Sequence, residues 1–595
     1  MRNIYLFLSF IFFQTGFSQA NILDWATYFG DANLEVFGSV YLDGELYIAG
    51  RATGNSLNMQ DIIDEQSFQA SYGGGRADGF IAKISEEGQP VWFTYYGNEG
   101  DDYLRDITTD GKSIYIVGNT TSNNMASPAA YQSSINGASD GYIACFNVDG
   151  DRLWHTYFGG EGPDSIHSIT YHEDNLYVYG TTESHSYIAT EGAFQETIAR
   201  DGSTEDYTNN FLAKFNKNGQ AIWATYYGRV SAIPSDGQVS YITGISANET
   251  GLYIAGWDTG TQSRADDTNY FGTPGAFLET SPVINNTLPW MSLYLSKFSF
   301  DGERLWSTYF YGYNSNGIPN SILPIFNGNY INDSKNIVAT SNGVYLSGNT
   351  VASYGIGTDG SFQPYKTGAN VSFINHFSDT GERLWGSYLG NGGAGSNFLT
   401  SDSLENIIIS GSTNSSSDIS TTDAYQTQPN GELDLFMARI SPDGTSKTYG
   451  TYYGGNDREH FGQVVIENED IFYLIGMSRS SGLATEGAYQ EELLDSENIL
   501  IARFISESLS VKDFNKDKFA LYPNPNDGNF IISSEAPLNN VSLEVFDMLG
   551  RKVYSHNIAE LETLSLSLNL PIGTYILKLT TEKKTVYTNK ILINK

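Results

Sequence analysis

The sequence has a single cysteine, Cys145, among 595 residues. One cysteine cannot form an intrachain disulfide, and it excludes the zinc and iron–sulfur sites that are built from several thiolates. Basic residues are also scarce, because 32 Lys and Arg stand against 68 Asp and Glu, for a formal net charge of -36. Such a surface repels nucleic acid and anionic lipid, so we predict no nucleic-acid partner.

Catalytic and metal-binding motifs are missing as well. None of the seven histidines belongs to a His-Glu-x-x-His pattern, and no Gly-x-Ser-x-Gly phrase stands between a strand and a helix, as a nucleophile elbow requires. The run from Asp513 to Asp517 resembles the start of a calcium loop, but Lys518 occupies the position where that loop needs glycine. We therefore predict no catalytic residue, no cofactor and no metal, with calcium unsupported, and we predict that the chain is not an enzyme.

Long apolar runs are confined to the N-terminus. Arg2 precedes the apolar residues 4–13, and small residues follow up to Ala20. This order is typical of a secretory signal peptide, and the run is too short to span a bilayer. We predict a signal peptide over residues 1–20 and no transmembrane segment elsewhere.

Aromatic residues and glycine are abundant, with 41 Tyr, 33 Phe and 62 Gly, and they recur in phase. The phrase Trp-x-Thr-Tyr-aromatic-Gly, with small variations, is found seven times, starting at Trp25, Trp92, Trp154, Trp223, Trp306, Trp385 and Tyr449. A fixed phrase that returns at similar intervals along most of the chain indicates a repeat architecture.

Three further phrases keep step with the first. Each unit has an apolar strand that ends in Gly, then an aromatic residue that is usually followed by Gln, then an alternating strand such as residues 80–84. Asp-Gly or a similar pair, such as Asp149-Gly150, separates that strand from the next Trp in six places, as a tight hairpin requires. Four short strands per unit predict an all-β, seven-bladed β-propeller. Over about residues 21–508 the pattern resembles the seven-bladed propeller repeat family of secreted bacterial proteins.

One position in the alternating strand is basic in six of the seven units. These candidate residues are Lys83, Lys214, Lys297, His376, Arg439 and Arg503, with Cys145 at the seventh position. They could form a ring of positive charge for an anionic ligand, or each could pair with a carboxylate of its own or the next unit. We favour the second interpretation, because repeated polar groups are commonly structural.

The repeats end before a polar segment, residues 509–518, which we interpret as a linker. About seven short strand-like runs follow in residues 519–595, and they predict a small immunoglobulin-like β-sandwich. This segment resembles the type A sorting domain of the type IX secretion system through Tyr522, Pro523, Asn524, Pro525, Gly528, Asp547, Gly550, Arg551, Gly573, Tyr575 and Lys590. The resemblance implies that the type IX machinery is a partner and that the protein is secreted or held at the outer-membrane cell surface.

Two functions remain open for the propeller. We favour a non-enzymatic binding or adhesion module for an extracellular glycan or protein ligand, because the repeats contain no deviating catalytic cluster. The alternative is a polysaccharide-active enzyme, a glycoside hydrolase or lyase, whose paired carboxylates would come from different units.

Overall fold

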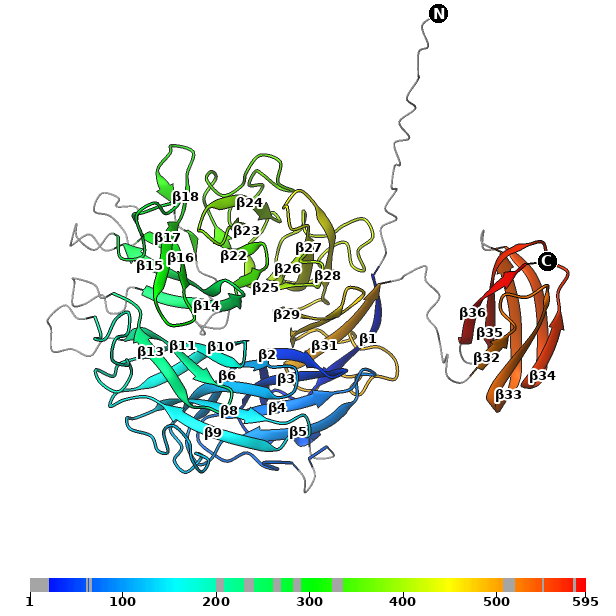
Figure 1. The fold of residues 1–595 in the computed structure, drawn as a ribbon, viewed down its shortest axis with the longest axis horizontal. Coiled ribbons are helices and arrows are strands. Elements are labelled where there is room, and N and C mark those ends of the chain that lie inside the picture. The colour runs from blue at the N-terminus through cyan, green and yellow to red at the C-terminus, as the bar shows by residue number, and fades with distance from the viewer. Residues whose placement is uncertain are drawn as a thin grey trace, which may run out of the picture. The chain divides into compact units, whose positions relative to one another are not determined.

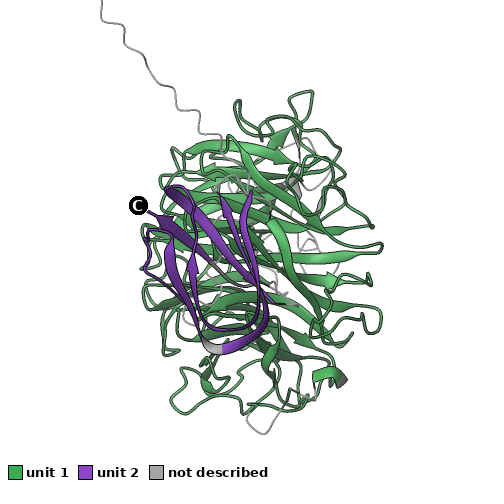
Figure 2. Ribbon diagram, turned by 90° about the vertical axis from the view of Figure 1, so that its right-hand side faces the viewer, with its two compact units in different colours: residues 1–506 green, residues 507–595 purple. Residues whose placement is uncertain are grey.

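The computed structural model describes residues 21–59, 62–63, 67–199, 208–229, 240–260, 269–281, 290–320, 322–323, 335–506, 519–547, 551–581 and 585–594. The chain divides into two compact units, Met1–Ser506 and Glu507–Lys595 (Figure 2). The predicted signal peptide and the predicted linker lie outside the described residues, so the domain boundaries stay predictions.

Seven antiparallel sheets of four or five strands form the described part of the first unit. We call them blades 1 to 7. Blade 1 contains β2 (Leu34–Leu42), β3 (Glu45–Ala52), β4 (Asp78–Ile84) and β5 (Pro90–Tyr96), and a 3-10 turn, Leu57–Met59, lies between β3 and β4. Blade 2 contains β6 (Asp102–Thr109), β7 (Ile114–Thr120), β8 (Asp140–Phe146) and β9 (Arg152–Phe158). Blade 3 contains β10 (Asp164–His172), β11 (Asn175–Thr182), β12 (Asn209–Asn216) and β13 (Ala221–Tyr226).

The remaining blades repeat this order. Blade 4 contains β14 (Ser240–Asn248), β15 (Gly251–Gly260), β16 (Trp290–Phe298) and β17 (Arg304–Phe310). Blade 5 contains β20 (Ile322–Leu323), β21 (Ile337–Thr340), β22 (Gly343–Thr350), β23 (Val371–Phe377) and β24 (Arg383–Leu389), and a small ribbon of β18 (Gly312–Tyr313) and β19 (Pro319–Asn320) precedes it. Blade 6 contains β25 (Ala394–Ser401), β26 (Ile407–Thr413), β27 (Asp434–Ile440) and β28 (Lys447–Tyr453). Blade 7 contains β29 (Glu459–Asn468), β30 (Ile471–Ser478), β31 (Asn498–Ser506) and β1 (Asn21–Phe29).

The innermost strand of each blade, which is its first strand except in blade 5, where we take β21, lines the middle of this unit. Each contacts the innermost strand of the next blade, from β2 through β6, β10, β14, β21, β25 and β29 and back to β2. The contacts therefore close a ring, and the blades follow one another around it (Figure 1). The all-β propeller prediction is confirmed, and we call this unit the propeller.

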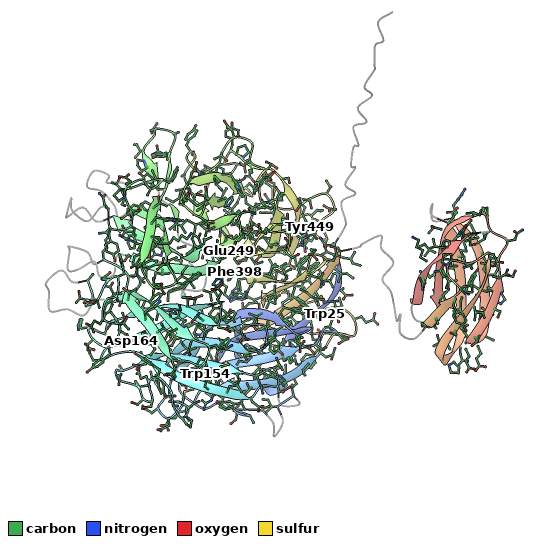
Figure 3. All side chains as sticks on the ribbon, viewed as in Figure 1. Trp25, Trp154, Asp164, Glu249, Phe398 and Tyr449 are labelled. Atoms are coloured by element: carbon green, nitrogen blue, oxygen red, sulfur yellow. The ribbon has the colours of Figure 1, made fainter. Side chains whose placement is uncertain are left out.

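The ring is closed by the two ends of the repeat region. β1 pairs antiparallel with β31, so the first strand of the chain is the outer strand of blade 7. The phrase that begins at Trp25 thus belongs to the outer strand of a blade, and each later phrase completes the blade before it. Figure 3 shows Phe398 near the centre and Trp25, Trp154 and Tyr449 further out.

The tryptophans of the phrase fasten each blade to the next. The Trp92 Nε1–H donates a hydrogen bond of 3.1 Å to the Val148 carbonyl, in the hairpin turn of blade 2. Gly150 of that turn has a φ of 90°, and its missing side chain leaves room for the Trp92 ring, 3.3 Å from where a Cβ would lie. The same bond runs from Trp25, Trp154, Trp223, Trp306 and Trp385 to the turn of the following blade.

Blade 6 has tyrosine, Tyr449, in place of that tryptophan. The outer strand of blade 7 comes from the N-terminal part of the sequence, so no hairpin joins β31 to it. Within the described part of the chain, no turn therefore faces Tyr449 in the way that Gly150 faces Trp92. The exception in the repeat thus follows from the closure of the ring.

The C-terminal unit has five strands in its described residues: β32 (Phe519–Tyr522), β33 (Asn529–Asp547), β34 (Lys552–Ser567), β35 (Gly573–Thr580) and β36 (Thr585–Ile593). β33 pairs with β34 on one side and with β32 and β35 on the other, around a core that includes Phe530, Leu543 and Leu577. We expected about seven short strands. β33 and β34 instead run on through the segment between Ser533 and Leu538, where their register shifts, so the short runs merge into long strands.

Among the described residues, we find no helix that is long and apolar enough to cross a membrane.

Candidate functional site: grooves between the blades

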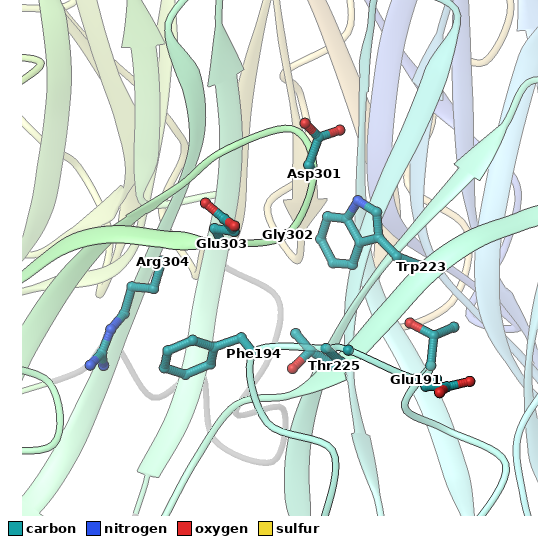
Figure 4. A pocket seen from close by; sticks show the side chains of 11 residues that line it. Glu191, Phe194, Trp223, Thr225, Asp301, Gly302, Glu303 and Arg304 are labelled. Atoms are coloured by element: carbon teal, nitrogen blue, oxygen red, sulfur yellow. The ribbon is translucent and has the colours of Figure 1, made fainter.

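Two equivalent grooves open between neighbouring blades. The first, of about 470 Å³, lies between blades 1 and 2 and is lined by Phe68, Trp92, Thr94 and Asp149 among others. The second, of about 350 Å³, lies between blades 3 and 4 and is lined by the matching residues Phe194, Trp223, Thr225 and Asp301 (Figure 4). The repeat therefore builds the same surface twice.

The aromatic residue that precedes the repeated Gln forms one wall of each groove. Phe68 is 41% exposed and Phe194 is 38% exposed, and the matching rings Tyr131, Phe277 and Tyr425 of other blades are 41–47% exposed. A guanidinium from the next blade lies over each of the two rings in the grooves: Arg152 is 4.9 Å from the centroid of Phe68, and Arg304 is 4.7 Å from that of Phe194. The arginine holds the ring in place while part of it stays in contact with solvent.

The polar atoms around these rings suit a hydroxylated ligand. In the second groove, Figure 4 shows the carboxylates of Glu191, Asp301 and Glu303 and the Thr225 hydroxyl around the space beside Trp223 and Phe194. Carboxylates accept hydrogen bonds from ligand hydroxyls, and an aromatic ring presents a flat apolar face. A groove that combines an aromatic wall with a few polar groups is typical of small-ligand sites.

The basic positions predicted from the sequence lie one in each of six blades, on the third strand. Each stands opposite the Trp or Tyr of the outer strand, as Lys83 does opposite Trp92, and five of the six stand opposite a tyrosine of the second strand. Among them, Lys83 also lines the first groove.

Their partners are local. Lys214 donates to the Phe300 carbonyl at 3.1 Å, and Lys297 forms an ion pair with Asp379 at 3.7 Å, each across to the following blade. Arg439 pairs with Asp402 at 3.5 Å, and Arg503 contacts Asp24, Glu86 and Glu467.

His376 stacks on Tyr345 at 4.0 Å, and burial lowers its pKa to about 4, so it is neutral near pH 7. Cys145, at the seventh position, is buried, and burial raises the pKa of its thiol to about 12. A thiol of this kind is not a nucleophile.

Paired carboxylates from different blades do occur, and sequence reasoning missed them. A Cβ added to Gly97 would lie 2.5 Å from Asp78 Oδ1 and 2.9 Å from Asp102 Oδ2, and the separation of these two oxygens cannot exceed the sum of the two distances. That limit is close to the spacing of the two carboxyls of a retaining glycosidase. Both side chains are completely buried, however, so they cannot reach a polysaccharide. We call Asp78–Asp102 and its two equivalents, described below, the seam pairs.

In the sorting motif, the structure brings Asn524 and Lys590 together and leaves Asp547 and Arg551 as a separate pair. The Asn524 side chain donates to the Lys590 carbonyl at 2.7 Å and accepts from the Leu592 amide at 2.8 Å, which joins the Tyr522–Pro525 segment to β36. Arg551 contacts the Asp547 carboxylate at 2.7 Å.

The other motif residues support the same unit. Gly528 has a φ of 104°, and a Cβ there would lie 2.4 Å from the Leu568 carbonyl oxygen. Tyr575 is buried and donates to the Pro571 carbonyl, and Gly573 begins β35. Gly550 lies outside the described residues.

Comparison with solved structures returns proteins of low identity. The α-L-arabinofuranosidase of Fusarium graminearum in complex with arabinobiose is 9% identical, with a TM-score of 0.31, over 82% of this chain and 98% of that chain. An α-L-arabinanase of Penicillium chrysogenum complexed with arabinobiose is 9% identical, with a TM-score of 0.32 and the same coverage. An ulvan lyase bound to its saccharide is 8% identical, with a TM-score of 0.28, over 96% of both chains. No curated protein sequence matches the chain.

These matches correct one prediction. We predicted that the chain is not an enzyme, and that prediction is wrong: it rested on missing motifs, whereas the matched structures are glycoside hydrolases and a polysaccharide lyase. At 8–9% identity the likeness concerns the fold, and no activity is transferred from it.

The C-terminal unit has a match in sequence. Residues 520–594 match the model of the secretion system C-terminal sorting domain, which covers the segment where the sequence resembled a type IX sorting signal. The protein is therefore a cargo of the type IX secretion machinery, exported to the cell surface or the extracellular space, and its residues 520–594 are a secretion system C-terminal sorting domain.

Proposed function

We propose that the protein is an exported polysaccharide-active protein whose propeller takes sugar rings into the grooves between its blades. The observation that carries this proposal is the repetition of one groove, with an exposed Phe, a Trp wall and an Asp from the hairpin turn of the next blade, at two places. A polymer with repeated units can occupy repeated grooves, and each additional contact raises the overall affinity without a new kind of interaction.

The charge of the chain narrows the class of polysaccharide. From Lys516 onward nine basic and eight acidic residues nearly cancel, so almost the whole excess of negative charge belongs to the propeller. A negatively charged surface disfavours sulfated and uronic-acid polymers. We therefore propose a neutral polysaccharide as the ligand or substrate.

The untested sequence predictions complete the proposal. Residues 1–20 are a signal peptide, residues 21–508 the propeller and residues 509–518 a linker to the sorting domain. The six basic positions serve packing against an aromatic residue of the outer strand and, in five of them, a tyrosine of the second strand. The local partners of Lys214, Lys297 and Arg439 support this role.

The test measures binding and turnover together on the full chain. Neutral and acidic polysaccharides are presented in parallel, and new reducing ends and unsaturated products are assayed in the same samples. Phe68→Ala with Phe194→Ala should weaken binding of the neutral polymer by about thirtyfold, since loss of each stacked ring costs roughly 1 kcal/mol. Phe68→Tyr should keep it.

Tyr187→Ala is the matched control, because Tyr187 is 76% exposed and lines neither groove. Binding that is equal in the double variant and in the control would remove the grooves from the proposal. An absence of both binding and product formation across the neutral polymers would overturn it.

A further inference from the structure

The seam pairs recur at three of the contacts between blades. Asp78 and Asp102 lie between blades 1 and 2, Asp140 and Asp164 between blades 2 and 3, and Asp434 and Glu459 between blades 6 and 7. In each, the first carboxylate begins the third strand of one blade and the second begins the first strand of the next. The glycine that ends the aromatic phrase, Gly97, Gly159 or Gly454, lies between the two.

The three pairs share their geometry. A Cβ on Gly159 would lie 2.8 Å from Asp140 Oδ1 and 2.6 Å from Asp164 Oδ2, and one on Gly454 would lie 2.8 Å from Asp434 Oδ1 and 2.6 Å from Glu459 Oε2. In both pairs the sum of the two distances sets the same upper limit on the separation of the facing oxygens as at Gly97. All six carboxylates are 0–2% exposed.

Neutral groups surround the first pair. Asp78 Oδ2 accepts hydrogen bonds from the Gly73 amide and the Gln69 side chain, and Asp102 Oδ2 accepts from the Asn98 amide and the Ser122 hydroxyl. Asp78 Oδ1, which faces Asp102, accepts no hydrogen bond from the described residues. One buried oxygen therefore points at another carboxylate with no donor on it.

No basic side chain compensates the pairs within the described residues. The charged and titratable groups around them are Asp101 with its partner Arg76, and the tyrosines Tyr28, Tyr72, Tyr95, Tyr96, Tyr142, Tyr157, Tyr452 and Tyr453. Burial raises the pKa of these tyrosines, so they stay neutral near pH 7. Two uncompensated negative charges at this distance in a buried site are strongly unfavourable.

Burial and the neighbouring carboxylate both raise the pKa of carboxyl groups in these pairs. Burial raises the pKa of Asp78 and of Asp164 to about 7, and the second carboxylate of each pair adds to the rise. The pKa values of Asp102, Asp140, Asp434 and Glu459 are raised as well, chiefly by burial.

We propose that each seam pair holds one shared proton in the folded protein, so that three contacts between blades are stronger in acidic solution and weaken when that proton is lost. At Asp78 the proton serves as the donor that the facing oxygen lacks, whereas the facing oxygens of Asp140 and Asp434 also accept from the Gly137 and Gly431 amides, at 3.3 and 3.1 Å. The glycine is required at this place because any side chain would occupy the space where the two carboxyls meet.

The chain contains its own neutral version of the site. Asn209 and Asn498 occupy the position of Asp78 in blades 3 and 7, and Ser240 occupies the position of Asp102 in blade 4. The Asn498 side chain donates to the Gly30 carbonyl at 2.5 Å. An amide therefore fits this position, and Asp→Asn is a substitution that the fold already accepts.

The raised pKa values determine how the stability of the folded protein changes with pH. The folded pair binds a proton more tightly than the unfolded chain, so its contribution to stability is complete below the ordinary pKa of 3.8 and is lost as the pH rises through about 7. The midpoint of thermal unfolding of the full chain should therefore fall by roughly a few degrees between pH 5 and pH 8 through these groups.

The test compares the wild type with the triple variant Asp78→Asn, Asp164→Ser, Asp434→Asn at the two pH values. Asp78 and Asp164 are the groups whose pKa is raised to about 7, and serine is the residue that blade 4 has at the position of Asp164. The variant should lose most of the fall in the unfolding midpoint, each single variant about a third of it. Asp43→Asn, in an exposed turn, should lose none. Infrared spectra of the folded wild type should show a carboxylic-acid carbonyl band at pH 6 that disappears by pH 8, and the triple variant should lack it.

Three results would overturn the proposal. The triple variant could keep the pH dependence of the wild type, or the carboxylic-acid band could be absent at pH 6. In the third, calcium would raise the unfolding midpoint of the wild type at pH 8 and leave the triple variant unchanged, which would place a cation between the carboxyls instead of a proton.

Discussion

The contact between blades 3 and 4 and the contact between blades 1 and 2 have the same backbone arrangement around a glycine. They differ in the charge of the side chains that flank this glycine. Between blades 1 and 2, two carboxylates face each other across Gly97, and no basic group among the residues that the structure describes reaches them. Between blades 3 and 4, Asn209 and Ser240 stand in their places across Gly228, and the adjacent Arg229 binds Asp258 through two hydrogen bonds of 2.8 and 2.9 Å. The fold thus accepts either a pair of carboxylates or a neutral pair at this place. The common feature of the two contacts is close packing at the glycine, not charge.

The largest expected loss of stability comes from removing the charge of Arg229, which compensates Asp258 at the contact between blades 3 and 4. Asp258 is completely buried and Arg229 is nearly so. Arg229→Met should lower the free energy of unfolding by about 3–5 kcal/mol, because it leaves a buried carboxylate without its ion pair. Chemical denaturation at pH 7 measures this loss. Adding Asp258→Asn should restore part of it, and a double variant as unstable as the single one would contradict the explanation.

The second largest loss of stability is expected from substitution of the glycines at these two contacts. A methyl group on Gly97 would overlap the Asp78 carboxylate, so Gly97→Ala should destabilise the propeller by about 1–3 kcal/mol. A Cβ on Gly228 would lie 2.7 Å from Asn209 Oδ1 and 3.1 Å from Ser240 Oγ, which are slightly longer contacts, so Gly228→Ala should cost less. Urea unfolding of the two variants ranks them. The reverse order would show that the carboxylates are not what confines Gly97.

The smallest effect is expected when a single carboxylate is introduced at the contact between blades 3 and 4. Asn209→Asp places a buried carboxylate opposite Ser240, so its pKa should rise above the ordinary range. At pH 8 the variant should be about 1–2 kcal/mol less stable than the wild type, and at pH 4, where the new group is protonated, the two should be equal. Thermal unfolding at both values measures the difference. A loss of the same size at pH 4 would point to a steric cause.

Much of the architecture could be predicted from recurring residues. The hairpin glycines Gly88, Gly150, Gly219, Gly302, Gly381 and Gly444 all have positive φ, as Asp-Gly and related turns led us to expect. The position of each repeated phrase within its blade could not be predicted in the same way. A periodic pattern does not say which strand is outermost, so the role of residues 21–29 in completing blade 7 is visible only once the pairing of β1 with β31 is known.

The seam pairs left a signal in the sequence that we did not use. An acidic residue stands five positions after the phrase glycine at Asp102, Asp164 and Glu459, and another stands eight or nine positions after the repeated Gln at Asp78, Asp140 and Asp434. The repeated Gln connects the two elements, since the Gln132 side chain contacts Asp140 and accepts from the Gly159 amide. Sequence spacing alone could not show that the two acidic residues meet, because they belong to different blades.

The pairing of β1 with β31 also makes the order of synthesis matter. Ribosomes release the N-terminal strand first, whereas its partner, Asn498–Ser506, is the last blade strand to be made. Until then β1 is an unpaired edge, which other chains can capture. A chain that stops short of residue 498 cannot close its circle, and it also lacks the sorting domain that follows. The secretion machinery therefore finds its signal only on molecules that already carry every strand needed for closure.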